Sequence, residues 1–530
     1  IMLIKIIQML KWLFLLFILI SVITTIITLV FNDFKPNEMY MGKKRPPINR
    51  DIKTHLDEVV EPYLLEHPNG TGLYLLDENL EAYADRILLA RGAERTLDLQ
   101  YYIWHDDLTG NMLGRELLAA ADRGVFIRIL LDDMNTVEKD IVLSGLAQHP
   151  YVEIRLFNPI YSRRNFVTRT VEMLFRGLSL NRRMHNKSMI ADSQIAIIGG
   201  RNIGNEYFDA DPNTNFLDVD LLLVGKAVQE AENIFESFWD SQASIPAKQV
   251  KFGHKDALTT LRETPLSLNE TEHQLLNDYK QSLLTHLTID DVMNKKSRFV
   301  WSDNVHVLSD PPEKVFGDKE YQWLITDILP KTWEAAQKSL YLISPYFVPG
   351  EEGTKALAQL SSSGKDVVIL TNSLAANDVP MVHAGYAPYR EALLKSGVKL
   401  YELMPFNVNY KLSKDWKIGA SGASLHTKAF IIDESKGFIG SFNLDPRSAR
   451  LNTEMGVFFE SPEIAEELMK SYKNVITSDV SYEVILRDQK MIWLDGSNGE
   501  SKEWDQDPET GWIKRAIVKI VSWLPVESQL

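Results

Sequence analysis

The sequence predicts an α/β protein of two similar lobes, because one pattern of residues occurs twice in its 530 residues. The pattern H-x-K-x4-D-x6-G-[G/S]-x-N begins at His185 and again at His426, 241 residues later. At average residue usage, chance would produce it roughly once in 10^7 to 10^8 starting positions. The repetition therefore indicates an internal duplication.

Three further pairs of stretches repeat at nearly the same offset. They are TLDLQYYIW and SLYLISPYF (from Thr96 and Ser339), RGVFIRILLDD and SGKDVVILTNS (from Arg123 and Ser363), and VEIRLFNP and VKLYELMP (from Val152 and Val398). Each half therefore has the order strand, helix, strand, helix, strand and motif hairpin, which is typical of βαβ units. Apolar runs such as IRILL indicate strands buried on both faces. We expect mostly parallel central sheets with helices on both sides.

The N-terminal segment is expected to anchor the chain in a membrane. Residues 12–31 carry no charge and would form a helix of roughly 30 Å, the thickness of a bilayer core. A signal peptide is the alternative, but this apolar region would be unusually long for one and no A-x-A-like cleavage site follows it. The charges on its two sides leave the orientation open.

The remaining domains follow from the positions of the repeats. We expect the anchor at 1–40, the first lobe at 41–250, a charged helical linker at 251–300, the second lobe at 301–480 and a C-terminal extension at 481–530. The absence of cysteine excludes disulfides and cysteine-ligated zinc. A net charge of −15 disfavours a general nucleic-acid binder, which needs a basic face.

Each motif is expected to form a β-hairpin that carries phosphodiester chemistry. Histidine and lysine two positions apart on a strand point the same way, and the small pairs Gly199–Gly200 and Gly440–Ser441 permit close approach. Two facing halves would place two histidines on opposite sides of one phosphate, where one attacks and the other protonates the leaving alcohol. Lysines and amides would neutralise the phosphate oxygens. The site residues of this hypothesis are His185, Lys187, Asn202, His426, Lys428 and Asn443.

The carboxylates divide into two groups. Asp192 and Asp433 lie at the hairpin turns, where aspartate commonly bonds its own backbone, so we expect a structural role for them. Asp220 and Glu454, on the strand after each motif, are expected to orient the imidazoles. No cluster of carboxylates converges on the phosphate, so we expect neither a metal nor another cofactor.

The duplicated pattern resembles the phospholipase D superfamily over about residues 70–480 and, more closely, bacterial cardiolipin synthases of the C class. The closer resemblance is carried by NRRMHNKS, GGRNIG, LTNSLAANDVPMVHAGY, SGASLHTK, IGSFNLDPRS, LNTEMG and WLPVE. The family implies two phospholipase D-like lobes, one site at their pseudo-twofold interface, a phosphohistidine intermediate and no metal. It also implies that His185 is the nucleophile and His426 the general acid.

The resemblance predicts a phosphatidyltransferase that makes cardiolipin in the bacterial cytoplasmic (inner) membrane. It implies phosphatidylglycerol as acceptor and phosphatidylethanolamine or phosphatidylglycerol as donor. A phospholipase D hydrolase with water as acceptor would use the same residues and is the alternative. A nuclease would share the motifs but not the anchor or the acidic charge, and an inactive scaffold would be expected to have lost motif residues.

Two segments are candidates for membrane contact. Before the first motif, apolar residues recur at helical spacing beside basic ones, although a buried helix with a solvated basic edge would give the same pattern. The C-terminal WIKRAIVKIVSWLP predicts an amphipathic helix that suits an anionic interface or docks on the protein. The membrane-contact candidates are Arg163, Arg164, Arg169, Arg176, Trp512 and Trp523.

Three further residues are candidates for substrate binding: Arg183, just before the first motif, and Asp378 and His383 in NDVPMVHAGY. The last two are candidates for choosing the acceptor. Structural hydrogen bonding is the alternative for both.

Overall fold

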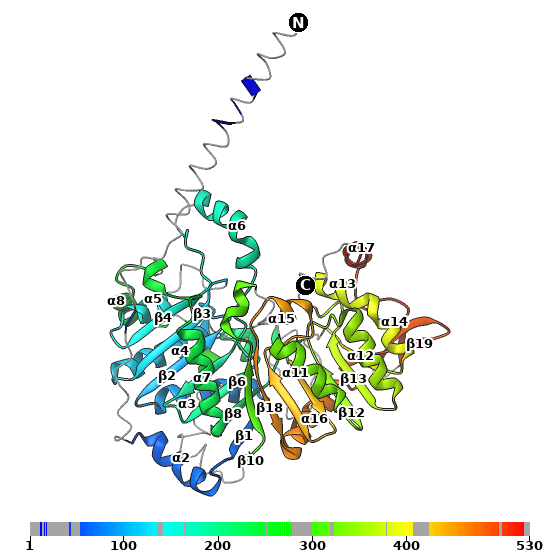
Figure 1. The fold of residues 1–530 in the computed structure, drawn as a ribbon, viewed down its shortest axis with the longest axis horizontal. Coiled ribbons are helices and arrows are strands. Elements are labelled where there is room, and N and C mark those ends of the chain that lie inside the picture. The colour runs from blue at the N-terminus through cyan, green and yellow to red at the C-terminus, as the bar shows by residue number, and fades with distance from the viewer. Residues whose placement is uncertain are drawn as a thin grey trace.

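The computed structural model describes residues 53–134, 141–163, 166–211, 213–250, 253–266, 299–317, 323–377, 379–405, 423–497 and 501–523, with single residues near 11–18, 42–43 and 268–277. Two helix-flanked sheets lie beside each other (Figure 1). The helices are α2 (His55–Glu66), α3 (Asn79–Gly92), α4 (Leu108–Asp122), α5 (Ile141–Gln148), α6 (Phe166–Leu180), α7 (Lys226–Trp239), α8 (Ala257–Glu263), α11 (Trp323–Glu334), α12 (Gly350–Ser362), α13 (Pro380–Tyr386), α14 (Arg390–Lys395), α15 (Pro446–Arg450), α16 (Pro462–Val475) and α17 (Trp512–Val521).

The first sheet has nine strands in the order β10-β1-β8-β6-β5-β2-β3-β4-β9. The motif hairpin β5-β6 lies between β8 and the parallel strands β2, β3 and β4. The strands are β1 (Thr71–Leu76), β2 (Thr96–Tyr101), β3 (Phe126–Asp132), β4 (Val152–Phe157), β5 (Ser188–Ala191), β6 (Ile195–Gly199), β8 (Asp220–Gly225), β9 (Ser244–Pro246) and β10 (Val300–Ser302).

The second sheet repeats this arrangement in ten strands, ordered β11-β18-β17-β16-β12-β13-β14-β19-β20-β21. Its motif hairpin β16-β17 lies between β18 and the parallel strands β12, β13 and β14. The strands are β11 (Val305–Ser309), β12 (Ser339–Ile343), β13 (Asp366–Asn372), β14 (Lys399–Leu403), β16 (Ala429–Ile432), β17 (Lys436–Gly440), β18 (Met455–Glu460), β19 (Ser481–Arg487), β20 (Lys490–Asp495) and β21 (Lys502–Trp504).

The sheets are mixed, and the prediction that they are mostly parallel is wrong. Within the nine- and ten-stranded sheets, β2-β3-β4 and β12-β13-β14 pair in parallel, whereas the other neighbours are antiparallel. The helical crossovers between matched repeats produce the parallel part. Within each motif hairpin, β5-β6 and β16-β17, the connecting turn has only three residues, and so short a connection allows only antiparallel neighbours.

The described strands also place two boundaries away from the expected positions. β10, at the end of the expected linker, pairs with β1 and so extends the first sheet. β19, β20 and β21, within the expected C-terminal extension, continue the second sheet beside β14. The second lobe therefore reaches Trp504.

The two lobes share one hydrophobic core. Ile190 and Leu223 of the first sheet belong to the same buried cluster as Ile431 and Val457 of the second. α16 packs against β1 and α7 against β11, so each lobe supplies a helix to the other. Because separating the lobes would expose this apolar surface at roughly 25 cal/mol per Å2, burial holds the two motifs in one relative position.

The expected anchor cannot be compared with a described segment. Its apolar stretch, residues 12–31, lies outside the described residues apart from single positions, as does much of the linker 251–300. Among the residues that the structure describes, no helix has the length and apolar character needed to cross a bilayer. Arg164 and Asp378 also lie outside the described residues.

Candidate active site

Both motif hairpins begin at the carboxyl ends of the parallel strands. Ser188 lies opposite Gln100, near the end of β2, and Ala429 lies opposite Ile343 at the end of β12. The preceding His185 and His426 therefore lie beyond those strand ends. This edge of an α/β sheet is where such proteins commonly bind ligands.

The turn aspartates fasten each hairpin to the neighbouring strand. Asp192 accepts hydrogen bonds from the backbone N–H groups of Glu94, Arg95 and Thr96 at 3.0, 2.8 and 2.8 Å. Asp433 accepts equivalent bonds from residues 337–339. These contacts support a structural role, although the bonded backbone belongs to the start of β2 or β12 rather than to the turn itself.

Each histidine is bonded to a carboxylate from the other lobe. His185 Nδ1 lies 2.8 Å from Glu454 Oε2, and His426 Nδ1 lies 2.5 Å from Asp218 Oδ2. Both carboxylates are buried. A carboxylate at Nδ1 fixes the tautomer and leaves Nε2 as the nitrogen available for chemistry.

Backbone contacts between the lobes hold this crosswise arrangement. His426 N donates to Leu217 O at 2.8 Å, next to Asp218, and β7 (Asn215–Leu217) pairs in parallel with β15 (Ala423–Leu425). His185 N donates to Thr453 O at 2.9 Å, next to Glu454. Neither lobe alone therefore supplies both members of the His185–Glu454 pair or of the His426–Asp218 pair.

Asp220 does not orient a histidine, and that prediction is corrected to Asp218. Asp220 is bonded instead to two buried cations, Arg86 at 2.9 Å and Arg201 at 3.1 Å. The strand register explains the error: Gly199 faces Asp220, whereas its repeat Gly440 faces Gly456, two residues after Glu454. The equivalent of Glu454 in the first lobe is therefore the residue two positions before Asp220, which is Asp218. The repeat thus indicates Asp218 as the orienting carboxylate.

The small motif residues leave room for these carboxylates. A Cβ on Gly200 would lie 2.2 Å from Asp218 Oδ1, and one on Gly440 would lie 2.3 Å from Met455 O. Ser441 has a second function, because its Oγ donates to Glu454 Oε2 at 2.5 Å. Gly200 therefore allows the Asp218 carboxylate to come close, and Gly440 allows the backbone of the neighbouring strand to come close.

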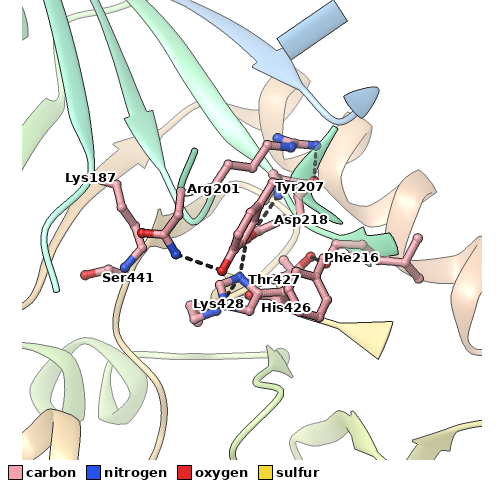
Figure 2. Close-up of polar contacts among 12 residues, drawn as sticks. Lys187, Arg201, Tyr207, Phe216, Asp218, His426, Thr427, Lys428 and Ser441 are labelled. Atoms are coloured by element: carbon pink, nitrogen blue, oxygen red, sulfur yellow. Dashed lines mark hydrogen bonds and ion pairs between the residues drawn. The ribbon is translucent and has the colours of Figure 1, made fainter. Parts of the chain in front are cut away.

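The two motif lysines are buried, and Figure 2 shows Lys428 beside His426. Lys187 Nζ donates to His185 O at 2.6 Å, and Lys428 Nζ lies 2.9 Å from His426 Nδ1. Burial, reinforced by the Lys428 charge, lowers the pKa of Lys187 well below its usual value. A phosphodiester anion bound between the two ammonium groups would stabilise both in their charged forms.

The two motif asparagines differ in their hydrogen bonds. Asn202 Oδ1 accepts from Ile103 N at 3.1 Å, and its Nδ2 donates to the Tyr207 hydroxyl at 2.9 Å. Asn443 is buried, and its Oδ1 has no hydrogen-bond partner among the described residues. Although Asn202 and Asn443 occupy equivalent positions in the two motifs, their side chains therefore have different hydrogen-bonding environments.

Three aromatic side chains complete the site, and sequence reasoning missed them. The Tyr102 ring lies edge-on to His185, with centroids 5.0 Å apart. Tyr207 lies edge-on to His426 at 5.2 Å, and Phe216 stacks on His426 at 4.9 Å (Figure 2). All three lie outside the motifs that begin at His185 and His426, so nothing in those motifs pointed to them.

The electrostatic environments of the two histidines differ. Burial lowers the pKa of His185 to about 4, despite the opposing attraction of Glu454, so its imidazole is neutral at pH 7. Burial also lowers the pKa of His426, whereas burial raises the pKa of its partner Asp218 to about 7. The first pair thus provides a neutral base or nucleophile, and the second pair retains a proton close to neutral pH.

The expected substrate-binding residues have buried structural partners. Arg183 Nη1 lies 3.4 Å from Asp132 Oδ1. His383 Nε2 lies 2.6 Å from Arg390 Nη2 and 3.3 Å from Asp507 Oδ1. These contacts support the structural alternative for His383, and they place the Arg183 guanidinium beside a buried carboxylate.

Two of the expected membrane-contact arginines face the protein, contrary to the prediction. Arg163 is ion-paired with Asp133, and Arg176 is ion-paired with Glu172 on α6. Both carboxylates are buried, so these two guanidinium groups turn toward the protein rather than toward solvent. Arg169 is exposed, as are Trp512 and Trp523.

Known proteins resemble this chain across both lobes. The family model described as "Cardiolipin synthase, PLD-like domain" matches residues 87–239 and 330–476. A cardiolipin synthase C from Escherichia coli K12 is 39% identical over 478 residues, which cover 89% of this chain and 99% of that protein. A Staphylococcus aureus cardiolipin synthase (strain Mu50) is 24% identical over 81% of this chain and 72% of its own length.

One solved structure shares the two-lobe fold. It is a phosphatidylserine synthase from Haemophilus influenzae Rd KW20, with a TM-score of 0.54 over 88% of this chain and 99% of that chain. The sequences are 14% identical, so this likeness concerns the fold alone.

Proposed function

The chain belongs to the cardiolipin synthase family of phospholipase D-like phosphatidyltransferases. We therefore propose that the site formed by both lobes makes cardiolipin in two half-reactions. His185 Nε2 attacks the donor phosphorus, and the bond between phosphorus and the head-group oxygen breaks. The departing alcohol takes a proton from the Asp218–His426 pair. A phosphatidyl group then remains bonded to His185.

In the second half-reaction the acceptor is phosphatidylglycerol. Its glycerol hydroxyl loses a proton to His426 and attacks the same phosphorus, and the phosphorus–nitrogen bond to His185 breaks. The products are cardiolipin and the regenerated enzyme. The donor is phosphatidylethanolamine, which releases ethanolamine, or a second phosphatidylglycerol, which releases glycerol.

The remaining polar groups of the site stabilise charge on the phosphate. Lys187 and Lys428 would neutralise the non-bridging oxygens as negative charge builds up in the transition state, and the Asn443 amide N–H can donate to the same oxygens. Asn202 instead positions Tyr207 beside His426. Glu454 keeps His185 in the tautomer whose Nε2 lone pair faces the phosphorus.

The observation that carries this mechanism is the crosswise pairing of each histidine with the other lobe's carboxylate. It makes a single site from two motifs, with inequivalent histidines on its two sides. A reaction through a covalent intermediate needs two different histidines, because one must attack the phosphorus while the other supplies a proton to the leaving alcohol.

The phospholipid substrates lie in a membrane. We propose the bacterial cytoplasmic membrane as the location, with residues 12–31 as a single-pass anchor. The length and the uncharged sequence of that stretch support an anchor.

Product analysis distinguishes this transferase from a phospholipase D hydrolase. The full-length protein would be incubated in vesicles of labelled phosphatidylglycerol, with and without phosphatidylethanolamine. We expect labelled cardiolipin, with ethanolamine release when phosphatidylethanolamine is the donor. Phosphatidic acid as the dominant lipid product in both mixtures would favour the hydrolase.

The pH profile should be bell-shaped with both limbs assigned to the histidine pairs. Activity requires neutral His185, so it is lost as the pH falls through about 4. It also requires the proton of the second pair, which Asp218 loses as the pH rises through about 7. The measurement is kcat/KM on a short-chain soluble phosphodiester between pH 3 and 9. Activity that only increases through this range would contradict the assignment.

Catalysis should not depend on a divalent metal. In the described residues the phosphate site contains two lysines and no group of side chains suited to a metal ion. The ammonium groups supply the stabilisation that a metal would otherwise give. Turnover should therefore be the same within about twofold after dialysis against a chelator. Loss of activity that one particular metal restores would overturn this expectation.

A further inference from the structure

Exposed apolar side chains gather on three helices of this molecule. Most of the large exposed hydrophobic residues between 53 and 523 lie on or beside α6, α13 and α17. These helices occupy the upper edge of the molecule in Figure 1, whereas α2 lies at the lower end. Such a concentration is unusual for a soluble surface and marks an interaction site.

This edge is also the edge that carries the active site. α6 follows β4 and α13 follows β13, so both helices leave the carboxyl ends of parallel strands. His185 and His426 lie beyond the carboxyl ends of β2 and β12 in the same two sheets. Because parallel neighbours end on one side, the apolar helices and the histidines lie on the same side of each sheet.

α6 turns its charged side inward and its apolar side outward. Glu172 accepts from Tyr161 N at 3.1 Å and from Ser162 N at 2.8 Å, and it is ion-paired with Arg176. The Arg176 guanidinium lies 4.7 Å from the centre of the Tyr161 ring. On the other side, Leu174 is 77% exposed. A helix that faced only water would have the reverse arrangement.

α17 docks by one side and exposes the other. Val518 is buried in a small cluster with Leu374 and Ala384, which fixes the helix against α13. The exposed residues Trp512, Ile513, Ile517, Ile520 and Trp523 fall within an arc of roughly 140°, at about 100° per residue. Lys514 and Lys519 flank this arc on its two sides. Tryptophans with flanking lysines are typical of a helix lying in a membrane interface.

We propose that α6, α13 and α17 form one docking surface on which a phospholipid bilayer lies, with the active site opening toward it. The inference rests on the proposed function insofar as the substrates are membrane lipids. The basic flanks of α17 complement anionic phosphatidylglycerol. Tryptophan residues near both ends of the α17 stripe match a headgroup layer better than the dry centre of a protein interface.

The absence of cysteine from the chain makes the proposal directly testable. Single variants Leu174→Cys, Met381→Cys and Ile520→Cys would carry an environment-sensitive fluorophore on the three helices. Leu65→Cys on α2 is the matched control, because Leu65 and Leu174 are both 77% exposed. Each full-length variant would be placed in vesicles of phosphatidylglycerol and phosphatidylethanolamine with nitroxide-labelled lipid.

We expect a blue shift and at least twofold quenching at positions 174, 381 and 520, with neither change at position 65. Equal signals at all four positions, or none at the three helices, would refute the docking surface. Protection from aqueous iodide at positions 174, 381 or 520 that increases with protein concentration at a fixed detergent concentration would also refute it, since a second copy would then be the occupant.

Cardiolipin formation measured in the same samples separates this proposal from the function. Quenching at the three helices without cardiolipin would leave the docking surface standing and remove the proposed reaction. Cardiolipin formation without quenching at the three helices would support the proposed reaction and refute the docking surface. The variant Leu174→Glu with Ile520→Glu adds a kinetic comparison: we expect at least a tenfold loss of turnover on vesicles and less than a twofold change on a soluble short-chain diester. Equal losses on both substrates would contradict docking.

Discussion

Replacement of His185 by Asn should reduce phosphatidyl transfer by at least about 10^4-fold, because it removes the proposed nucleophile of a covalent reaction. Asparagine keeps a polar side chain of similar size, so the lobe interface should remain folded. No head group should be released from any donor. The measurement is single-turnover release from labelled lipid, with circular dichroism as the control for folding. Residual transfer within tenfold of the wild type would exclude a nucleophilic His185.

His426→Asn should fail at a different chemical step. The variant lacks the general acid, but p-nitrophenolate leaves without protonation. With phosphatidyl-p-nitrophenol as donor, we therefore expect a rapid release of about one equivalent of p-nitrophenol, followed by a stop, because His426 is also the base of the second step. A burst from His185→Asn and none from His426→Asn would reverse the two roles.

The second large effect is expected at Asp218, the carboxylate bonded to His426. Asp218→Asn should reduce kcat by about 10^3- to 10^4-fold, because an amide favours the wrong tautomer of the imidazole. The high-pH limb near 7 should also disappear from the profile, since Asp218 is the group assigned to it. A kcat within threefold of the wild type would contradict the pairing.

Asp220→Asn is the matched control two residues away. Asp220 lies between Arg86 and Arg201, so the substitution leaves two buried guanidinium groups partly unpaired. We expect it to lower the free energy of unfolding by about 3 kcal/mol, measured by urea denaturation. The folded fraction should keep the wild-type pH profile. The opposite pattern, with a stable but inactive Asp220 variant, would restore Asp220 as the orienting group.

The sequence alone predicts the motifs and the duplication, because the same chemistry requires the same residue types at the same spacing in both halves. His185, Lys187 and Glu454 are found together in the structure for that reason. The sheet direction was misjudged, because a strand's apolar pattern is the same whether its neighbour runs parallel or antiparallel. Two acidic residues flank Val219, and the choice of Asp218 requires the strands after the two motifs to be aligned so that Asp218 matches Glu454 and Asp220 matches Gly456.

Features that depend on contacts across the molecule could not be read from local patterns. Tyr102 and Tyr207 reach the histidines through folds of the chain outside the motifs. The inward-facing Arg163, before α6, and Arg176, on α6, are ion-paired with Asp133 and Glu172. Only the folded chain places the Arg163 partner, Asp133, next to it. A basic residue in a sequence has no visible partner, so a charge-based surface assignment fails wherever a buried carboxylate meets it.

The central claim is that both lobes build one site in which His185 carries the phosphatidyl group. The most direct measurement is mass spectrometry of the adduct that should accumulate in His426→Asn after one exposure to phosphatidyl-p-nitrophenol, with quenching and digestion at alkaline pH to preserve phosphohistidine. We predict a single modified peptide with the phosphatidyl group on His185. Modification elsewhere, or complete p-nitrophenol release with no covalent lipid, would contradict the mechanism.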